Sequence, residues 1–207
     1  MTADLAFEYA LRDHGHLYVA GLDEAGRGAW AGPVVAAAVV LPLDRADLAD
    51  ALVGVNDSKQ LTARRREAMF DRICQVVVGV GVGSASHAEI DAEGIVPATR
   101  LAMCRALTSL PVRPTHLLVD FVSLPESGLP FTAIAKGDAK SLSIAAASII
   151  AKVTRDHVME DLHEQYPRYG FAAHKGYGTA LHRDALKNFG PCPVHRLSFR
   201  PLGRPDQ

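Results

Sequence analysis

Four carboxylates stand at or just after the ends of short apolar runs in this sequence. Asp23 and Glu24 are adjacent after the first run, Asp120 ends a second run, and Asp138 follows a third. If the corresponding strands adjoin, these side chains cluster, and carboxylates about 4 Å apart repel by about 4 kcal/mol at an effective dielectric constant near 20. Such a cluster takes up protons or binds cations. Its oxygen ligands favour Mg²⁺ or Mn²⁺ over zinc, and paired ions of this kind suit phosphodiester hydrolysis.

The same acids also have simpler structural explanations. Each of them taken alone fits a helix cap or a loop position. Adjacent residues of a regular strand point to opposite faces of the sheet. Asp23 and Glu24 therefore converge only if their strand ends or bulges at this point, which the glycines that follow permit. Together, the four acids are our candidates for the catalytic and metal-binding residues.

A Gly-Arg-Gly sequence, from Gly26 to Gly28, directly follows the first two acids. Such a sequence is common in hairpin turns, where glycine supplies a positive φ. It also exposes main-chain N–H and C=O groups to a closely approaching sugar-phosphate, and Arg27 adds a positive charge. Its position beside Asp23 and Glu24 favours the second interpretation, so all three residues are substrate-binding candidates.

Polar side chains on a long helix, expected over residues 143–165, form a further group. Ser148, Lys152 and Asp156 are spaced four residues apart and share one face of this helix. A solvated helix face is the common explanation of such a stripe. Because the helix begins just after Asp138, we expect its first turns near the acids, which makes Ser148 and Lys152 substrate-binding candidates.

Three more candidates come from loops. Lys59 belongs to the polar stretch 56–59, and Tyr177 stands close to Lys175 among glycines. This arrangement stacks an aromatic ring on a sugar or base while Lys175 pairs with a phosphate. In the alternative, Tyr177 packs over the helix that follows. The nine histidines show no metal-ligand spacing, and we expect most of them at the surface.

The alternation of apolar runs and turn residues predicts an α/β fold. Strands are expected in a hairpin over 18–41 and over 75–84, 115–120 and 131–135. Helices are expected from the N-cap Thr62 to about Cys74, from a capping box at 86–89, and over 97–109, 143–165 and 179–188. This order implies a mixed sheet flanked by helices in one domain over 1–207. We expect a helical C-terminal region over 143–190 and a frayed tail after Phe199.

Composition restricts the class of protein. The 207 residues suffice for one sizeable core, and the longest apolar runs, 34–41 and 144–151, are shorter than the roughly 20 residues of a membrane span. The N-terminus lacks signal-peptide features and the three cysteines form no CxxC pair, so we expect a cytoplasmic protein without disulfides or structural zinc. Residues 1–135 contain 11 basic and 16 acidic residues, and residues 136–207 contain 11 and 7. This imbalance fits a basic surface beside an acidic pocket, or two ordinary solvated faces.

Taken in order along the chain, several stretches resemble the ribonuclease HII family. The matching stretches are 21–28, 57–59, 119–120, 136–138, 145–156 and 174–177. Each stretch alone is a weak signal, but the ordered set runs from residue 18 to about 196 and is highly specific. Two positions depart from the family pattern. Trp30 replaces a smaller or aliphatic residue, and Leu197 interrupts a His-Arg-Arg-Ser-Phe sequence, which weakens the case for a basic role there.

The resemblance implies a ribonuclease H-like fold and endonucleolytic cleavage of RNA in RNA–DNA hybrids. It also implies cleavage at single ribonucleotides within duplex DNA, with 5′-phosphate and 3′-hydroxyl ends as products. By this resemblance, Asp23, Glu24 and Asp120 are metal ligands, Asp138 completes the catalytic set, and two Mg²⁺ or Mn²⁺ ions are the cofactor.

The resemblance also assigns roles in substrate recognition. Gly26, Arg27 and Gly28 would contact the ribose 2′-hydroxyl, and Tyr177 would stack on the sugar just beyond the ribonucleotide. The expected partner is nucleic acid, with no membrane association, and we expect a monomer. Two rival interpretations remain open: a hybrid-binding module without catalysis, and another nuclease of the same fold.

Overall fold

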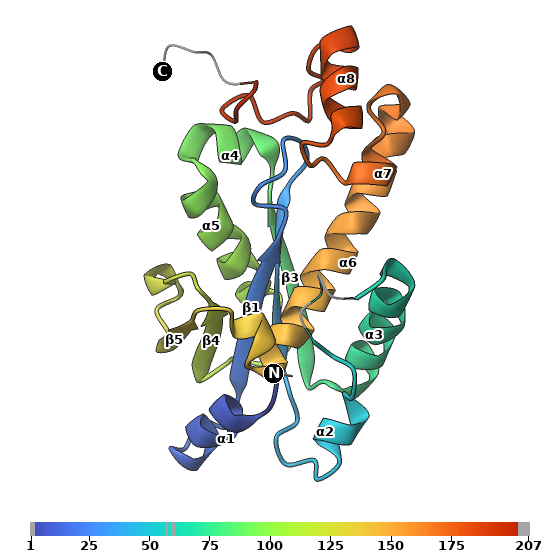
Figure 1. Cartoon of the computed structure of the whole chain (residues 1–207). Helices are drawn as coiled ribbons and strands as arrows, with labels where there is room; N and C mark the ends of the chain where they lie inside the picture. Colours follow the sequence, from blue (N-terminus) through green and yellow to red (C-terminus); the bar gives the residue numbers. More distant parts are fainter. Residues whose placement is uncertain (1–2, 57, 59–60, 203–207) are drawn as a thin grey trace.

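A five-stranded mixed sheet forms the centre of the molecule (Figure 1). The computed structural model describes residues 3–56, 58 and 61–202. The strands are β1 Val19–Ala25, β2 Val34–Val40, β3 Gly79–Ala85, β4 His116–Asp120 and β5 Phe131–Ile134. Their order is β3-β2-β1-β4-β5, with β2 antiparallel to both β1 and β3, and β4 parallel to both β1 and β5. The predicted mixed sheet is confirmed.

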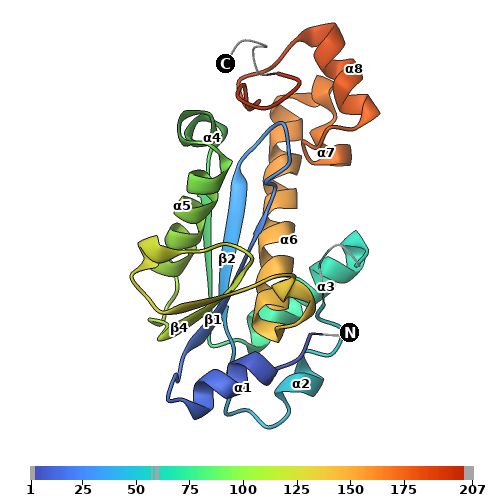
Figure 2. The ribbon, with the colours of Figure 1, turned by 60° about the vertical axis from the view of Figure 1, so that its left-hand side comes forward.

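Helices cover both faces of this sheet. They are α1 Ala6–Asp13, α2 Leu48–Ala51, α3 Ala63–Val76, α4 His87–Glu93, α5 Ile95–Thr108, α6 Leu142–Gln165, α7 Phe171–His174 and α8 Ala180–Phe189. Short 3₁₀ turns are η2 Pro125–Ser127, η3 Gly137–Ala139 and η4 Pro167–Tyr169. Figure 2 shows α5 on one face of the sheet and α6 on the other, with α7 and α8 at the far end of α6.

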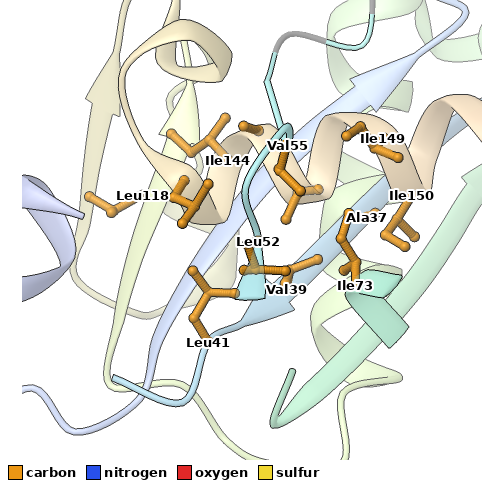
Figure 3. Close-up of a cluster of buried hydrophobic side chains, with 14 of the residues drawn as sticks. Ala37, Val39, Leu41, Leu52, Val55, Ile73, Leu118, Ile144, Ile149 and Ile150 are labelled. Atoms are coloured by element: carbon orange, nitrogen blue, oxygen red, sulfur yellow. The ribbon is translucent and has the colours of Figure 1, made fainter. Parts of the chain in front are cut away.

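The strand β2, which lies between β3 and β1, is buried on both faces, which explains its uninterrupted apolar sequence. Ala37 and Val39 pack in one cluster with Ile150 of α6, as Figure 3 shows. The alternate residue Ala38 packs in a second cluster with Ala102 of α5. The period of two along the strand therefore divides the core between two helical layers.

Helix α6 lies unusually close to β1. A Cβ atom at Gly21 would lie 2.2 Å from the main-chain carbon of Ser143, so only glycine fits at that point. The small side chains of Ala145, Ala146 and Ala147 are fully buried and continue this close contact. The first turns of α6 are thereby fixed over the strand that carries Asp23.

The N-terminus of α6 is held from α1 by a buried carboxylate. Glu8 Oε1 accepts hydrogen bonds from the hydroxyls of Ser141 and Ser143, both at 2.6 Å, and from the Ser143 N–H at 2.9 Å. Negative charge at a helix N-terminus is stabilising because it meets unpaired N–H groups and the positive end of the helix dipole. Glu8 therefore fixes the junction through which the chain passes from η3 into α6.

Most of the predicted elements are confirmed, with boundary corrections. Thr62 and Ser86 cap their helices as expected, and Thr179, expected as the first residue of the last helix, is its N-cap. The strand predicted over 75–84 begins later because its first residues end α3, and α1 and α2 were not anticipated. Of the tail expected to fray, residues 200–202 form a turn, whereas 203–207 lie outside the described residues.

No helix within the described ranges is both long enough and apolar enough to pass through a lipid bilayer.

Candidate active site

Three acids meet where the parallel β1–β4 ladder ends. Asp23 of β1 and Asp120 of β4 each lie one residue beyond Leu22 and Val119, the last pair of the parallel β1–β4 ladder. Asp138 belongs to η3, which follows β5. One carboxylate oxygen from each acid lies within 4.8 Å of the others, and Asp23 and Asp138 are buried. In the part of the chain that the structure describes, no other group of acids, histidines or cysteines is close enough to share a metal ion.

Glu24 is placed differently from the other three acids. The antiparallel ladder runs regularly through the pairs of Asp23, Glu24 and Ala25, so β1 neither bulges nor ends at Glu24. The local distortion considered for this position is therefore absent from β1. The Glu24 side chain lies outside the group of three but lines the same pocket, where its Oε1 accepts a hydrogen bond from Arg27 Nη1 at 3.2 Å.

The surroundings of Asp23 disfavour the ionised form of its carboxyl group. Burial, followed by the charges of Glu24 and Asp120, raises the pKa of the Asp23 carboxyl well above its usual value. The charge of Asp138 adds to this effect, and a hydrogen bond from the Glu24 N–H opposes it. An anion confined among other anions is stabilised by a bound cation, so the oxygen donors present fit a hard divalent metal ion.

A pocket of about 220 Å³ opens over the acids. It is lined by Asp23, Glu24, Ala25, Gly26, Arg27, Gly28, Ser58, Asp120, Ser148, Lys152 and Tyr177. The structure thus brings together three of the four predicted acids, the Gly-Arg-Gly sequence and three further predicted substrate-binding residues in one pocket. Lys175 lines an adjoining pocket of about 440 Å³, which shares Lys152 and Tyr177 with the first. The predicted residue Lys59 lies outside the described residues.

The polar stripe of α6 faces the pocket rather than open solvent. Ser148 is buried and donates to the Ser58 hydroxyl at 2.8 Å. Lys152 donates to Asp156 at 2.6 Å, and burial lowers the pKa of the Lys152 ammonium although Asp156 opposes this effect. The solvated-face interpretation of this stripe is therefore wrong.

The two glycines of the Gly-Arg-Gly sequence are needed for different reasons. Gly26 has φ +94°, and a Cβ atom there would lie 1.9 Å from Nε of Arg155. At Gly28 an added Cβ would meet no protein atom within 4 Å. Gly26 is therefore required by the fold, whereas the absent side chain of Gly28 leaves open space on the pocket.

Comparison with known proteins agrees with this geometry. The family model for ribonuclease HII matches residues 20–201. A ribonuclease HII of Chloroflexus aurantiacus is 56% identical over 202 residues, which cover 98% of this chain and 95% of the relative. The chain belongs to the ribonuclease HII family.

Solved structures support the same assignment. The ribonuclease H2 of Pyrococcus horikoshii superposes with a TM-score of 0.75 at 32% identity, covering 89% of this chain and 95% of that one. The ribonuclease HII of Archaeoglobus fulgidus, solved in complex with PCNA, gives a TM-score of 0.73 at 30% identity, covering 87% and 92%. The ribonuclease H-like fold is confirmed, and the chain is a hydrolytic endonuclease of the ribonuclease H type that acts on nucleic acid.

Within this ribonuclease HII chain, Arg155 is an important residue that motif reasoning did not assign to the site. Its buried guanidinium donates to the carbonyls of Pro33 at 3.0 Å, Lys175 at 2.9 Å and Ala31 at 3.2 Å. It also lies 5.3 Å from the centre of the Tyr177 ring. Arg155 therefore joins the segment after the Gly-Arg-Gly sequence to the loop that carries Tyr177. Its position within the stretch 145–156, which resembles the family, is the feature of the sequence that could have identified it.

Arg196 is a second buried arginine that motif reasoning missed. It donates to the carbonyls of Gly32 at 3.0 Å and Arg27 at 2.9 Å. Burial, reinforced by the charge of Arg155, lowers the pKa of Arg196 to about 9. A basic role near the C-terminus was in doubt because of the departure at Leu197, and Arg196 instead serves to support the main chain of the Gly-Arg-Gly turn.

Three of the nine histidines are exceptions to the expectation that most histidines lie at the surface. His174, His182 and His195 are buried beneath the loop that carries Tyr177. Trp30, which departs from the family pattern, is half-buried and packs against His182 with ring centres 5.4 Å apart. These histidines have no sequence spacing that would have distinguished them from surface residues.

Proposed function

We propose that this ribonuclease HII hydrolyses the phosphodiester bond next to a ribonucleotide, in RNA–DNA hybrids and at single ribonucleotides within duplex DNA. The observation that carries the proposal is the meeting of Asp23, Asp120 and Asp138 within 4.8 Å, beside a glycine-bounded turn on the same pocket. The expected products are 5′-phosphate and 3′-hydroxyl ends.

Asp23, Asp120 and Asp138, together with Glu24, would hold one or two Mg²⁺ or Mn²⁺ ions. Support comes from the all-oxygen donor set and from the raised pKa of Asp23, which reflects its burial and then the charges of Glu24 and Asp120. When bound, such ions lower the pKa of an attacking water and stabilise the leaving 3′-oxygen.

The Gly-Arg-Gly turn would recognise the ribose. The 2′-hydroxyl is both a donor and an acceptor, so main-chain N–H and C=O groups can distinguish RNA from DNA. The open space at Gly28 allows a sugar to approach the main chain closely, and Arg155 and Arg196 hold the turn from behind. Arg27 would supply a charge to the neighbouring phosphate.

Tyr177 would stack on the sugar just beyond the ribonucleotide. Its ring lines the pocket and lies 5.9 Å from Lys152 Nζ and 5.3 Å from the Arg155 guanidinium carbon. Ser148, Lys152 and Lys175 would contact the backbone of the nucleic acid on either side of the ring, and Lys59 is proposed for the same role on its sequence position alone.

We extend the proposal to the organisation of the chain. A single domain over 1–207 is supported because Tyr177, from the C-terminal region, lines the same pocket as Asp23 from β1. A monomer in the cytoplasm is proposed, and the free thiols of Cys74, Cys104 and Cys192 are consistent with a reducing compartment.

The test is a cleavage assay on a labelled DNA duplex containing one ribonucleotide, with and without a chelator. The proposal expects one cut adjacent to the ribonucleotide, leaving a 3′-hydroxyl, abolished by the chelator and restored by Mg²⁺ or Mn²⁺. An all-DNA duplex of the same sequence is the control. Binding without cleavage in the presence of metal ions, or cleavage of the all-DNA duplex, would refute the proposal.

A further inference from the structure

Two buried histidines lie in line behind Tyr177. His182 Nδ1 is 3.0 Å from the Tyr177 carbonyl oxygen, and His182 Nε2 is 3.0 Å from His195 Nε2. At the far end, the N–H of Cys192 donates to His195 Nδ1 at 2.9 Å. A continuous hydrogen-bonded chain therefore runs from the C-terminal loop to the main chain of Tyr177.

The partners of this chain determine both tautomers. His195 Nδ1 also lies 3.2 Å from the Cys192 carbonyl oxygen and 3.1 Å from the Cys192 sulfur, but a proton on Nδ1 would leave the Cys192 N–H without its acceptor. The ring proton of a neutral His195 is therefore on Nε2. His182 Nε2 must then accept a hydrogen bond from the His195 Nε2–H. The proton of a neutral His182 is therefore on Nδ1, facing the Tyr177 carbonyl. Each donor in the chain meets an acceptor only in this arrangement.

A third imidazole completes the support. His174 stacks on His182 with ring centres 4.5 Å apart and an interplanar angle of 14°. Its Nδ1 accepts from the Gly176 N–H at 3.2 Å, so its proton is on Nε2, which lies 2.7 Å from the Tyr169 carbonyl. Burial lowers the pKa of all three imidazoles, that of His182 to about 4, which agrees with three neutral rings.

The loop that carries Tyr177 depends on these contacts. The Tyr177 N–H donates to the His174 carbonyl at 2.9 Å, and the Gly176 carbonyl accepts from the Trp30 N–H at 2.8 Å. With the histidine contacts added, the N–H and C=O groups of both Gly176 and Tyr177 are hydrogen-bonded. The main chain on which the aromatic ring is mounted is therefore fixed by imidazoles that themselves lie away from the acids.

We propose that His182 and His195, with His174 stacked beside them, are positioning residues for Tyr177: a neutral imidazole chain of fixed tautomers that holds its ring over the substrate pocket. The proposal rests on the proposed function to the extent that Tyr177 contacts the substrate. It assigns no contact with nucleic acid or metal to the histidines. Its effect is expected on substrate binding and not on the hydrolytic step, since the group of three acids is formed by other elements.

The tautomers can be measured without any variant. Long-range ¹H–¹⁵N correlation spectra of the uniformly labelled protein at pH 7 should show the proton on Nδ1 of His182 and on Nε2 of His174 and His195. All three rings should remain neutral when the pH is lowered to 6. A proton on Nε2 of His182, or a protonated His195 at pH 6, would overturn the proposal regardless of whether the protein cleaves RNA.

The functional test is a double-mutant cycle with Tyr177. His182→Phe retains a ring against Trp30 but loses the imidazole donor to the Tyr177 carbonyl, which keeps the Thr179 N–H at 2.8 Å as a donor. We expect KM to rise about fivefold to tenfold with kcat within about twofold. His182→Asn retains an amide N–H near the position of Nδ1 and should recover most of the loss. Added to Tyr177→Ala, His182→Phe should raise KM by less than about twofold further, since no ring remains to be positioned. His14→Phe, at an exposed site, is the matched control.

The outcomes test the positioning role of the histidines separately from the contact of Tyr177 with substrate. Independent, multiplicative effects of His182→Phe and Tyr177→Ala on KM would overturn the positioning role, as would a loss confined to kcat. If Tyr177→Ala leaves KM unchanged, the contact of Tyr177 with substrate is refuted and the positioning role is refuted with it, while the tautomer measurement still stands as a statement about the fold. If His182→Phe does not fold, His182→Asn and the spectra decide.

Discussion

The main-chain N–H of Gly137 donates to Oδ1 of Asp120 over 2.7 Å. This single contact joins the end of β4 to the turn η3, and the residue after Gly137 is Asp138, the third member of the acidic group. One oxygen of Asp120 is thus used to place another acid, which explains how a residue outside the sheet reaches the ends of two strands. The site is therefore built by a hydrogen bond between its own members as well as by strand register.

Replacing Asp120 should separate activity from stability. Asp120→Asn retains an oxygen that can accept from Gly137 but removes one negative charge from the cluster. We expect cleavage to fall at least about a thousandfold, since a metal ligand worth several kcal/mol in the transition state is lost. The melting temperature in metal-free buffer should stay the same or rise, because repulsion on Asp23 is relieved. Near-normal turnover would rule out the assignment of Asp120.

The pH dependence of stability should reveal Asp23. Its carboxyl pKa is raised in the folded protein above the usual value of 3.8, so the folded state binds the proton more tightly than the unfolded state does. Its contribution to stability is therefore complete below pH 3.8 and is lost as the pH rises through the folded pKa. Chemical denaturation of metal-free protein should show Asp23→Asn gaining stability over wild type as pH rises from about 4 to 7. A constant difference would contradict the raised pKa.

Added metal ions should reverse this penalty. Mn²⁺ or Mg²⁺ at pH 7 should raise the melting temperature of the wild type because the ion binds the folded state alone. Asp23→Asn should show a much smaller shift at the same metal concentration. Samples without added metal ions and samples treated with a chelator serve as controls. Equal shifts of the melting temperature in the two proteins would show that the stabilising ion binds elsewhere.

The two glycines of the turn should respond in opposite ways to alanine. Gly26→Ala introduces a side chain at φ +94° and against Arg155, so we expect a fall in melting temperature of several degrees. Gly28→Ala meets no protein atom and should leave the melting temperature nearly unchanged while cleavage falls, because its methyl group enters the pocket. Parallel losses of stability and activity in Gly28→Ala would count against a sugar-binding turn.

Arg196 should be intolerant of lysine. A lysine retains the charge but cannot donate to the carbonyls of Arg27 and Gly32 together, and an unsatisfied buried carbonyl costs about 1–3 kcal/mol. We expect Arg196→Lys to be destabilised by about that amount in urea denaturation. The control is Arg183→Lys, at an exposed arginine that also donates to a carbonyl, that of Gly178. Equal stability of the two variants would show that Arg196 does not support the turn.

Local sequence patterns were enough for the strands, the helix caps and the choice of the acids. Thr62 and Ser86 cap their helices through contacts three residues away, which is why sequence alone identifies them. The position of Asp120 at the end of β4 was also predictable, since the end of an apolar run is a local property, whereas β1 continues past Asp23 to Ala25. The helix α1 was missed, and with it Glu8, whose partners are more than 130 residues distant.

The other features of the site depend on tertiary contacts, which the sequence does not show. Whether Glu24 turns toward Asp23 depends on the β1–β2 ladder, which is regular where a distortion was considered. Arg155, Arg196 and the buried histidines act by meeting main-chain carbonyls and N–H groups, and any residue supplies those groups, so no sequence motif records the pairing. The residues that line the pocket were therefore more predictable than the residues that support them.

The most direct measurement is anomalous diffraction from crystals soaked in Mn²⁺. The account predicts a manganese peak within direct coordination distance, about 2.0–2.3 Å, of carboxylate oxygens from Asp23, Asp120 and Asp138. A protein that cleaves a ribonucleotide-containing duplex in Mn²⁺, yet whose crystals show no manganese at these three acids or show it only elsewhere, would contradict the account.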